Sequence, residues 1–293
     1  MGIRSTSVVS ASDYILVTRA FGETTSATVL AADPLVIVGS AALEGDTSKD
    51  GLFTTKTSVY NFAQEVRTPI EMTEMAIATS TRTSPDAWAF EKMKAGNEHK
   101  LKIERALLFG ERASAYSSAN RRLATRGLKT FVASANRFAV GGSMLEYDFD
   151  EYLRTIFRNG SGDQSSSTKI ALVNDLFATT VARFAKSRVQ ITNQNDTSYG
   201  VNITNYKVPQ GTLKIVYDKL LDEVYTGTGY ALIYDPANVR LRYFAGSQFN
   251  GRTKIYENIQ ANDATKRKDE YRTTVGLECR QATTHGEISG VTN

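Results

Sequence analysis

The segment from Thr83 to Gly110 constrains the fold more than any other part of the chain, because its sequence predicts a single long helix. Ser84 is a suitable N-cap, Pro85 suits the first helical position, and Asp86 lies where the helix dipole favours an anion. Gly110 fits the left-handed position that commonly ends a helix. About 25 residues lie between these ends, or about 37 Å at ~1.5 Å per residue, which is about twice the mean helix length.

The middle of this helix, from Glu91 to Arg105, is polar, whereas both of its ends are apolar. Glu98 and Lys102 stand in the i,i+4 order that stabilises a helix. A long helix with a charged middle is typical of an exposed beam that supports other elements, not of a helix buried on all sides. On this segment alone, an ordinary long surface helix is the alternative.

Composition limits the class of protein. The chain has 293 residues, of which 41% are hydrophobic and 23% charged, so it can bury a large core and is neither disordered nor fibrous. Its single cysteine, Cys279, excludes a disulfide framework and a cysteine-based metal site. The net charge of +4 is modest for a dedicated nucleic-acid binder. The basic runs at 121–126 and 266–268 therefore indicate solvated surface, with weak contact to an anionic polymer as the alternative.

The sequence predicts no membrane-spanning segment. The longest apolar run, from Leu35 to Leu43, is far shorter than the ~20 residues that a spanning helix needs. The first residues lack the apolar region of a secretory signal. They match a myristoylation pattern, but this pattern is short enough to occur often by chance. We therefore expect synthesis in the cytosol.

Two stretches of strand-forming residues, Leu35–Val38 and Lys56–Arg67, flank a polar turn at Glu44–Gly51. Residues 1–34 precede them, are rich in Ser, Thr and Ala, and predict an extended arm. A hairpin of this length with a polar tip cannot be stable alone in water. It therefore needs another surface on which to lie.

Strand and helix patterns alternate after the long helix. Residues 112–126 are polar with helical potential, and residues 149–157 place apolar side chains at helical spacing. A buried strand at 169–173 and a helix at 174–187 complete a compact α/β unit, and the rest of the chain is mostly strand. The late strand at 271–280 alternates cleanly and places five residues on one face: Tyr271, Thr273, Val275, Leu277 and Cys279.

The sequence contains no recognisable catalytic motif. His99, one of two histidines, lies in the charged middle of the helix and is interpreted as a surface residue. A serine-nucleophile elbow, a zinc-binding histidine pair and a phosphate-binding loop do not occur. We predict no enzyme activity, no cofactor and no metal. Three acidic groups are interpreted as turn or helix N-terminal residues, with weak divalent-ion binding as the alternative: Glu71 and Glu74; Asp148, Asp150 and Glu151; Asp218, Asp222 and Glu223.

Several segments, taken in their order along the chain, resemble one known family. They are Asn61-Phe-Ala-Gln-Glu-Val-Arg, Ile70-Glu-Met-Thr-Glu, Leu101-Lys-Ile-Glu-Arg-Ala-Leu-Leu-Phe-Gly-Glu, Arg126-Gly-Leu-Lys-Thr-Phe-Val, and the ending from Lys268 to Gly290. Over about residues 30–293 the chain is similar to the SU10-type major head proteins, which belong to the HK97-like major capsid proteins of tailed bacteriophages. The resemblance rests on the order of elements together with these local matches.

The resemblance implies an α+β fold of the HK97 type. Its parts would be an N-terminal arm (1–35), an E-loop hairpin (36–75), a peripheral domain with a long spine helix (76–127), an axial domain (128–250) and a peripheral return with a long strand (251–293). The E-loop would lie over a neighbouring subunit, with Glu44, Asp46, Lys49 and Asp50 at its tip. The spine helix, 84–109, would contain or border Ser84, Pro85, Trp88, Met93, Ile103, Leu107 and Gly110. The long peripheral strand would contain Tyr271, Val275, Leu277 and Cys279.

The resemblance also implies a function. The chain would be a major capsid protein that self-assembles into the pentamers and hexamers of an icosahedral shell around double-stranded DNA. It would assemble in the bacterial host cytoplasm and reside in the virion. The implied partners are further copies of itself, separate scaffolding and portal proteins, optional decoration proteins and, weakly, the packaged DNA, with no membrane. Lys49 is a conceivable donor for a Lys–Asn cross-link, but nothing singles out its partner. An encapsulin-like compartment and a soluble α/β enzyme are the alternatives.

Overall fold

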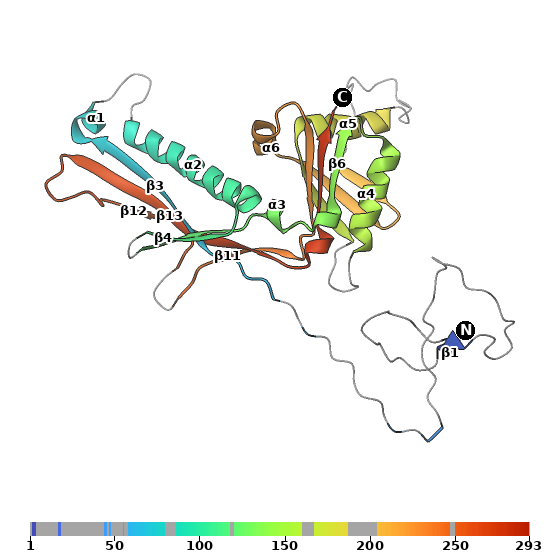
Figure 1. The fold of residues 1–293 in the computed structure, drawn as a ribbon. Helices are drawn as coiled ribbons and strands as arrows, with labels where there is room; N and C mark the ends of the chain where they lie inside the picture. The colour runs from blue at the N-terminus through green and yellow to red at the C-terminus, as the bar shows by residue number, and fades with distance from the viewer. Residues whose placement is uncertain are drawn as a thin grey trace. The chain divides into compact units, whose positions relative to one another are not determined.

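The computed structural model describes residues 2–3, 17–18, 44–45, 47, 55, 58–79, 86–117, 120–159, 167–186, 204–246 and 250–292 (Figure 1). The chain divides into two compact units, Met1–Thr57 and Ser58–Asn293. In the first unit, two short strands, β1 (Gly2–Ile3) and β2 (Val17–Thr18), pair antiparallel. The predicted strand at 35–38 lies outside the described residues.

In the second unit, a four-stranded sheet is built around one long strand, β13 (Lys266–Cys279). On one edge of β13, β3 (Gln64–Thr73) pairs antiparallel over ten residue pairs, and a short helix, α1 (Glu74–Ala78), follows it. On the other edge, β11 (Val239–Tyr243) and β12 (Lys254–Tyr256) pair with separate stretches of β13. The strand predicted at 56–67 thus begins later, at Gln64, and its described partner is β13.

The predicted long helix is confirmed as α2 (Ala87–Phe109), which lies along one face of this sheet (Figure 1). Its N-terminus differs from the prediction, because the cap is Asp86 and not Ser84. The Asp86 carboxylate accepts a hydrogen bond from the Ala89 backbone N–H at 2.9 Å, which is the same interaction that a serine cap would supply. Ser84 and Pro85 lie outside the described residues.

At the other end of α2, Gly110 is not left-handed as predicted, because its φ is −57° and its ψ is 148°. Glycine is required there for a different reason. A Cβ at Gly110 would lie 2.4 Å from the Ala106 carbonyl oxygen and 2.5 Å from that of Thr125. Gly127 donates its N–H to the Gly110 carbonyl at 2.7 Å, and a Cβ on Gly127 would lie 2.6 Å from the Gly110 nitrogen. Two glycines therefore allow two backbone segments to meet where α2 ends.

The polar stretch after α2 is a hairpin and not the predicted helical segment. Its strands are β4 (Ala113–Ser117) and β5 (Asn120–Ala124), which pair antiparallel. Ser114, Ser117 and Asn120 are weak helix formers, and the paired strands satisfy the backbone groups locally.

A second sheet has six strands in the order β6-β14-β10-β7-β9-β8. Two of its pairs, β14 with β6 and β7 with β9, are parallel, and the other pairs are antiparallel. The strand bounds, in chain order, are β6 (Arg137–Gly142), β7 (Thr168–Val173), β8 (Asn205–Val208), β9 (Gly211–Tyr217), β10 (Gly229–Tyr234) and β14 (Gly286–Val291).

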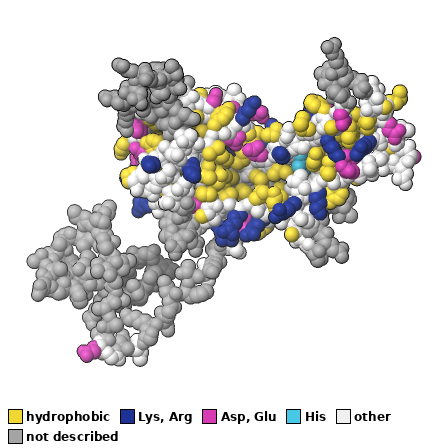
Figure 2. Space-filling model, turned by 180° about the vertical axis from the view of Figure 1, so that it is seen from behind, with side chains coloured by type: hydrophobic (Ala, Val, Ile, Leu, Met, Phe, Trp, Pro, Cys, Tyr) yellow, Lys and Arg dark blue, Asp and Glu magenta, His cyan; other side chains and the backbone are white. Residues whose placement is uncertain are grey.

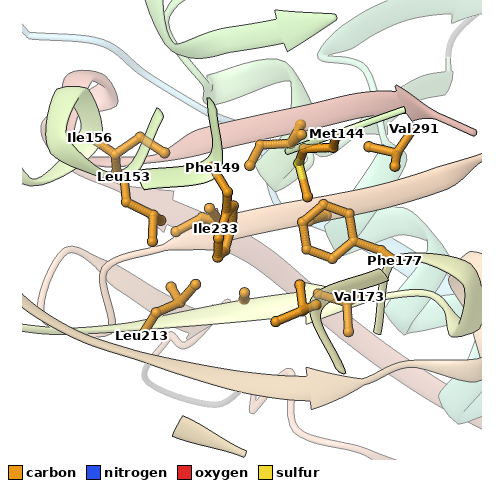
Figure 3. Packing of buried hydrophobic residues seen from close by; sticks show 13 residues of the cluster. Met144, Phe149, Leu153, Ile156, Val173, Phe177, Leu213, Ile233 and Val291 are labelled. Atoms are coloured by element: carbon orange, nitrogen blue, oxygen red, sulfur yellow. The ribbon is translucent and has the colours of Figure 1, made fainter. Parts of the chain in front are cut away.

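Both faces of the six-stranded sheet are covered by helices (Figure 1). On one face α4 (Glu146–Arg158) and α5 (Asp175–Lys186) pack on the sheet, and Figure 3 shows Phe149, Phe177 and Ile233 in this core. On the other face α3 (Leu128–Phe131) and α6 (Lys219–Val224) share a core with Leu108 of α2 and Leu277 of β13. This second core joins the two sheets. Short 3-10 helices, Ser134–Asn136 and Ala282–Thr284, precede β6 and β14.

The division between the two sheets does not follow the predicted domain boundary at residue 250. β11 belongs to the range predicted as axial, yet it pairs with β13 in the four-stranded sheet. β14 belongs to the range predicted as the peripheral return, yet it pairs with β10 and β6 in the six-stranded sheet. Each strand joins the sheet of its hydrogen-bonding partner, and these partners lie far apart in the sequence. A division of the chain into consecutive ranges therefore cannot describe the two sheets.

Candidate functional site

A buried polar chain lies between α2 and the four-stranded sheet. Its centre is His99, which is only 1% exposed, so the prediction of a surface histidine is wrong. The Nδ1 of His99 lies 3.0 Å from the Thr68 hydroxyl of β3, and its Nε2 lies 2.7 Å from the Thr273 hydroxyl of β13. The helix is thus hydrogen-bonded to two neighbouring strands through one imidazole.

The surrounding donors fix the tautomer of this histidine. Thr273 donates its own hydroxyl proton to Thr253 at 2.9 Å, so it accepts a hydrogen bond from the Nε2–H of His99. Thr68 accepts from the Lys102 ammonium at 3.3 Å and donates to Nδ1. Burial, and secondly the charge of Lys102, lower the pKa of His99, so the imidazole is neutral.

The other residues predicted for the helix divide between buried and exposed positions. Trp88 is buried, and Ile103 and Leu107 are half-buried. Met93 is 61% exposed, and two apolar residues that were not predicted as part of this surface, Phe90 and Leu101, are exposed on the same side of the helix. The exposed side of α2, which contains Phe90, Met93 and Leu101, is therefore more apolar than the charged middle of the helix suggests.

On the long strand, odd-numbered residues of β13 face α2, as the alternation predicts. Val275 and Leu277 are buried, whereas Tyr271 and Cys279 are half-buried. The Tyr271 hydroxyl donates to the Lys92 carbonyl of α2 at 3.3 Å. A role of these residues in assembly stays a prediction.

The opposite face of the four-stranded sheet carries paired charges. The basic run at 266–268, predicted as solvated surface, is exposed in part and paired: Lys266 contacts Glu71, and Lys268 lies 3.7 Å from the same carboxylate. Hydrogen bonding to Lys266 lowers the pKa of Glu71. At the other end of β13, Glu278 contacts Arg242 and lies 2.6 Å from Arg280.

Asn61 anchors the segment that leads into β3. Its Nδ2 donates to the Leu277 carbonyl at 2.8 Å and to the Arg126 carbonyl at 3.1 Å. Its Oδ1 accepts from the Arg126 N–H at 2.7 Å. The point at which the predicted E-loop returns to the sheet is thus fixed to both β13 and the segment after β5.

The predicted E-loop tip is described only in part. Glu44 and Gly45 form an exposed turn, in which Gly45 has a φ of 77°. Asp46, Lys49 and Asp50 lie outside the described residues.

Cys279 and His285 lie in contact, and their hydrogen bonds show that this contact supports the fold and does not form a reactive pair. The Cys279 sulfur lies 3.2 Å from Nε2 of His285, but Nδ1 accepts from the Asp235 N–H, so Nε2 carries the proton and donates to the Arg280 carbonyl at 3.1 Å. Burial raises the pKa of the Cys279 thiol to about 12. The histidine therefore does not activate the thiol.

A buried ion pair adjoins this contact. Lys169 of β7 donates to the Thr284 carbonyl at 3.0 Å and lies 3.5 Å from the Asp235 carboxylate, with both side chains fully buried. Burial lowers the pKa of Lys169, and the charge of Asp235 opposes this shift. The pair holds the segment between β13 and β14 against the six-stranded sheet.

Within the described ranges, no group of three or more His, Cys, Asp or Glu side chains is arranged to hold a metal ion. No helix among these residues is both long and apolar enough to cross a membrane.

Several solved viral capsids share this fold. The satellite phage P4 procapsid, determined with its size determination (Sid) protein, is 12% identical and gives a TM-score of 0.51, covering 90% of this chain and 82% of that chain. The cyanophage P-SCSP1u capsid is 9% identical, with a TM-score of 0.51 and coverage of 85% and 81%. The cyanophage A-1(L) capsid is 12% identical, with a TM-score of 0.51 and coverage of 78% of each chain. These likenesses confirm the predicted α+β fold of HK97-type capsid subunits.

The family model of the SU10 major capsid protein matches residues 6–292, and the chain belongs to this family. The predicted resemblance is thereby confirmed. The chain is a major capsid protein of a tailed bacteriophage and forms an icosahedral shell. A search of curated proteins finds no match.

Proposed function

We propose that copies of this chain associate into pentamers and hexamers and that their shell encloses double-stranded DNA. The observation that carries this proposal is the family match over residues 6–292 on a fold shared with phage capsids. In a ring each contact joins different patches of adjacent copies, and the ring closes by rotation. Obligate contacts of this kind commonly bury ~2,000–5,000 Å². Many such contacts acting together make a shell persistent even when each one is weak.

Exposed apolar side chains support association. Phe90 and Met93 of α2 are 53% and 61% exposed, Tyr147 of α4 is 75% exposed, and Phe244 after β11 is 55% exposed. Large apolar side chains gain free energy when a neighbouring subunit removes them from water. We assign the shell-building role to such surfaces and propose no enzymatic role for the chain.

The remaining roles follow from membership of the family. We propose that assembly takes place in the bacterial host cytoplasm with a separate scaffolding protein and a portal, and that contact with packaged DNA is weak and nonspecific. The parts proposed to act are the hairpin at 36–75, whose tip lies over a neighbouring copy, and the spine helix α2, which supports the sheet beneath it.

Replacing Glu44–Gly51 by a short Gly-Ser turn tests this proposal. The subunit should fold, because its described cores lie within Ser58–Asn293, but the yield of closed shells should fall strongly. Negative-stain electron microscopy measures the shells, and circular dichroism with thermal unfolding checks the fold. Closed shells at the yield and stability of the unmodified protein would contradict the proposed role of the hairpin.

A further inference from the structure

A groove of about 1070 Å³ crosses the four-stranded sheet beside the β4–β5 hairpin. It continues into a smaller cavity of about 340 Å³ that shares its residues 61–63 and Phe244. Its walls come from the segment before β3, from β3, β5 and β13, and from the residue after β11. The lining residues that matter here are Phe62, Arg67, Arg121, Arg122, Phe244 and Thr274.

The groove combines positively charged side chains with apolar ones. Three arginines and one glutamate, Glu65, line it. Glu65 is already paired, since it lies 2.9 Å from Arg67 and 3.5 Å from Arg272. Arg121 and Arg122 are exposed on β5, and the Arg121 guanidinium lies 5.3 Å from the centre of the Phe62 ring. Figure 2 shows that Lys and Arg side chains gather beside hydrophobic ones on one face of the molecule.

One segment of this chain has the complementary chemistry. Residues 44–51 contain Glu44, Asp46 and Asp50 against a single lysine, Lys49, so their formal charge is 1 − 3 = −2. Glu44 is exposed in its turn, so its carboxylate faces solvent in the isolated subunit. Carboxylates are the groups that arginine binds best, because its planar guanidinium can donate two parallel hydrogen bonds.

We infer that the arginine groove receives the acidic tip, residues 44–51, from a second copy of the chain. This inference rests on the proposed function, in which the hairpin reaches a neighbour, and it adds the receiving surface and the charges that select it. Packaged DNA is the competing polyanion. The acidic tip fits better, because the positive charge of the groove is local: it has three arginines, of which Arg67 is already paired with Glu65, and this matches three carboxylates better than a continuous phosphate chain.

Charge reversal on each side tests the inference. The first variant carries R121E and R122E, and the second carries E44K, D46K and D50K. Each alone places like charges together, so each should raise the protein concentration needed for shell assembly by about tenfold or more. An equimolar mixture should restore assembly in part, because the two variants can alternate around a six-membered ring, whereas a five-membered ring must keep at least one like-charged contact. Light scattering and negative-stain electron microscopy on nuclease-treated protein provide the measurement.

Matched variants separate this effect from misfolding. R154E reverses an exposed arginine on α4, outside the groove, and should assemble normally. R121Q with R122Q keeps hydrogen-bond donors without charge and should give a smaller rise than reversal. Normal assembly of the R121E, R122E variant would overturn the inference.

Two further results would also overturn the inference. Rescue when both sets of changes are in one chain, with no gain at all in the mixture, would mean that the tip binds its own groove. Normal empty shells that retain less DNA would assign the groove to nucleic acid. Failure of the unmodified protein to form any shell would instead refute the proposed function itself.

Discussion

At the scale of single residues, His99 shows how a polar group can hold a helix on a sheet. Each of its ring nitrogens has one threonine partner, and each threonine has a further partner, so the whole chain of hydrogen bonds is satisfied while buried. A second proton on the ring would place a cation in this interior and beside Lys102, and would require Thr68 to give up its donor role.

The stability of the subunit should therefore decrease as the pH falls below about 6.5. Burial lowers the pKa values of both His99 and His285 from an ordinary value of 6.5, so between that value and the folded-state pKa the unfolded chain binds more protons. Urea unfolding at pH 7 and pH 5 should show a lower midpoint at pH 5. H99Q should reduce this difference by removing one of the two contributions, and H285Q should remove the other.

The paired carboxylates Glu71 and Glu278 act in a different pH window from the two histidines. Pairing with basic residues lowers the pKa values of Glu71 and Glu278, so the stability that they supply is present above an ordinary value of 4.5 and is lost only as the pH falls further. An H99Q variant with the same change between pH 7 and pH 5 as the unmodified protein would contradict the role given to His99.

At the scale of elements, the features that could be predicted are those that a local pattern in the sequence determines. The length and charged middle of α2, and the alternation along β13, were sufficient to predict both elements. The partner of β3 was not predictable, because it lies far along the chain in β13. The burial of His99 was not predictable for the same reason, since its partners Thr68 and Thr273 come from two strands that are distant in the sequence.

The candidate surfaces were predictable to a smaller extent. The acidic tip at 44–51 is visible in the sequence, because all its charges are adjacent. The groove proposed to receive the tip is not visible in the sequence, because Arg67 and Arg121 line one groove only when β3 and β5 lie beside each other. Gly110 was correctly expected at the end of α2, but the reason is a close backbone approach and not a left-handed conformation.

The end of α2 supplies a prediction about an element. G127A should destabilise the subunit by about 1–3 kcal/mol or more, because the added Cβ would lie within 2.6–2.8 Å of backbone atoms of Gly110 and Leu108 that cannot move independently. G142A in β6 is the matched control, since a Cβ there meets nothing within 4 Å. Urea unfolding of the dissociated subunits measures both variants. Equal free energies of unfolding would show that the backbone crossing is not tightly constrained.

At the scale of the whole molecule, charges of both signs occur in nearly equal numbers. The chain has 35 basic and 31 acidic residues, and several basic side chains on the four-stranded sheet are already paired within the subunit. The attraction of such a surface for a polyanion is small and is weakened further by physiological salt. Shell formation therefore depends on contacts between subunits.

Assembly should accordingly proceed without nucleic acid. Purified protein treated with nuclease and washed in high salt should still form closed shells when returned to assembly conditions, as judged by sedimentation and electron microscopy. Particles that form only after DNA or RNA is added would contradict this prediction and would move the driving force from protein contacts to the polyanion.

The place of β14 in the six-stranded sheet has a consequence for the order in which the subunit is made. In the described sheet β6 has one hydrogen-bonded neighbour, β14, which the ribosome produces 291 − 142 = 149 residues later. At a synthesis rate of about 5–20 residues per second, about 7–30 s pass between the synthesis of β6 and that of its neighbour. A polypeptide that stops before residue 286 therefore leaves both β6 and β10 with an unpaired edge in the six-stranded sheet.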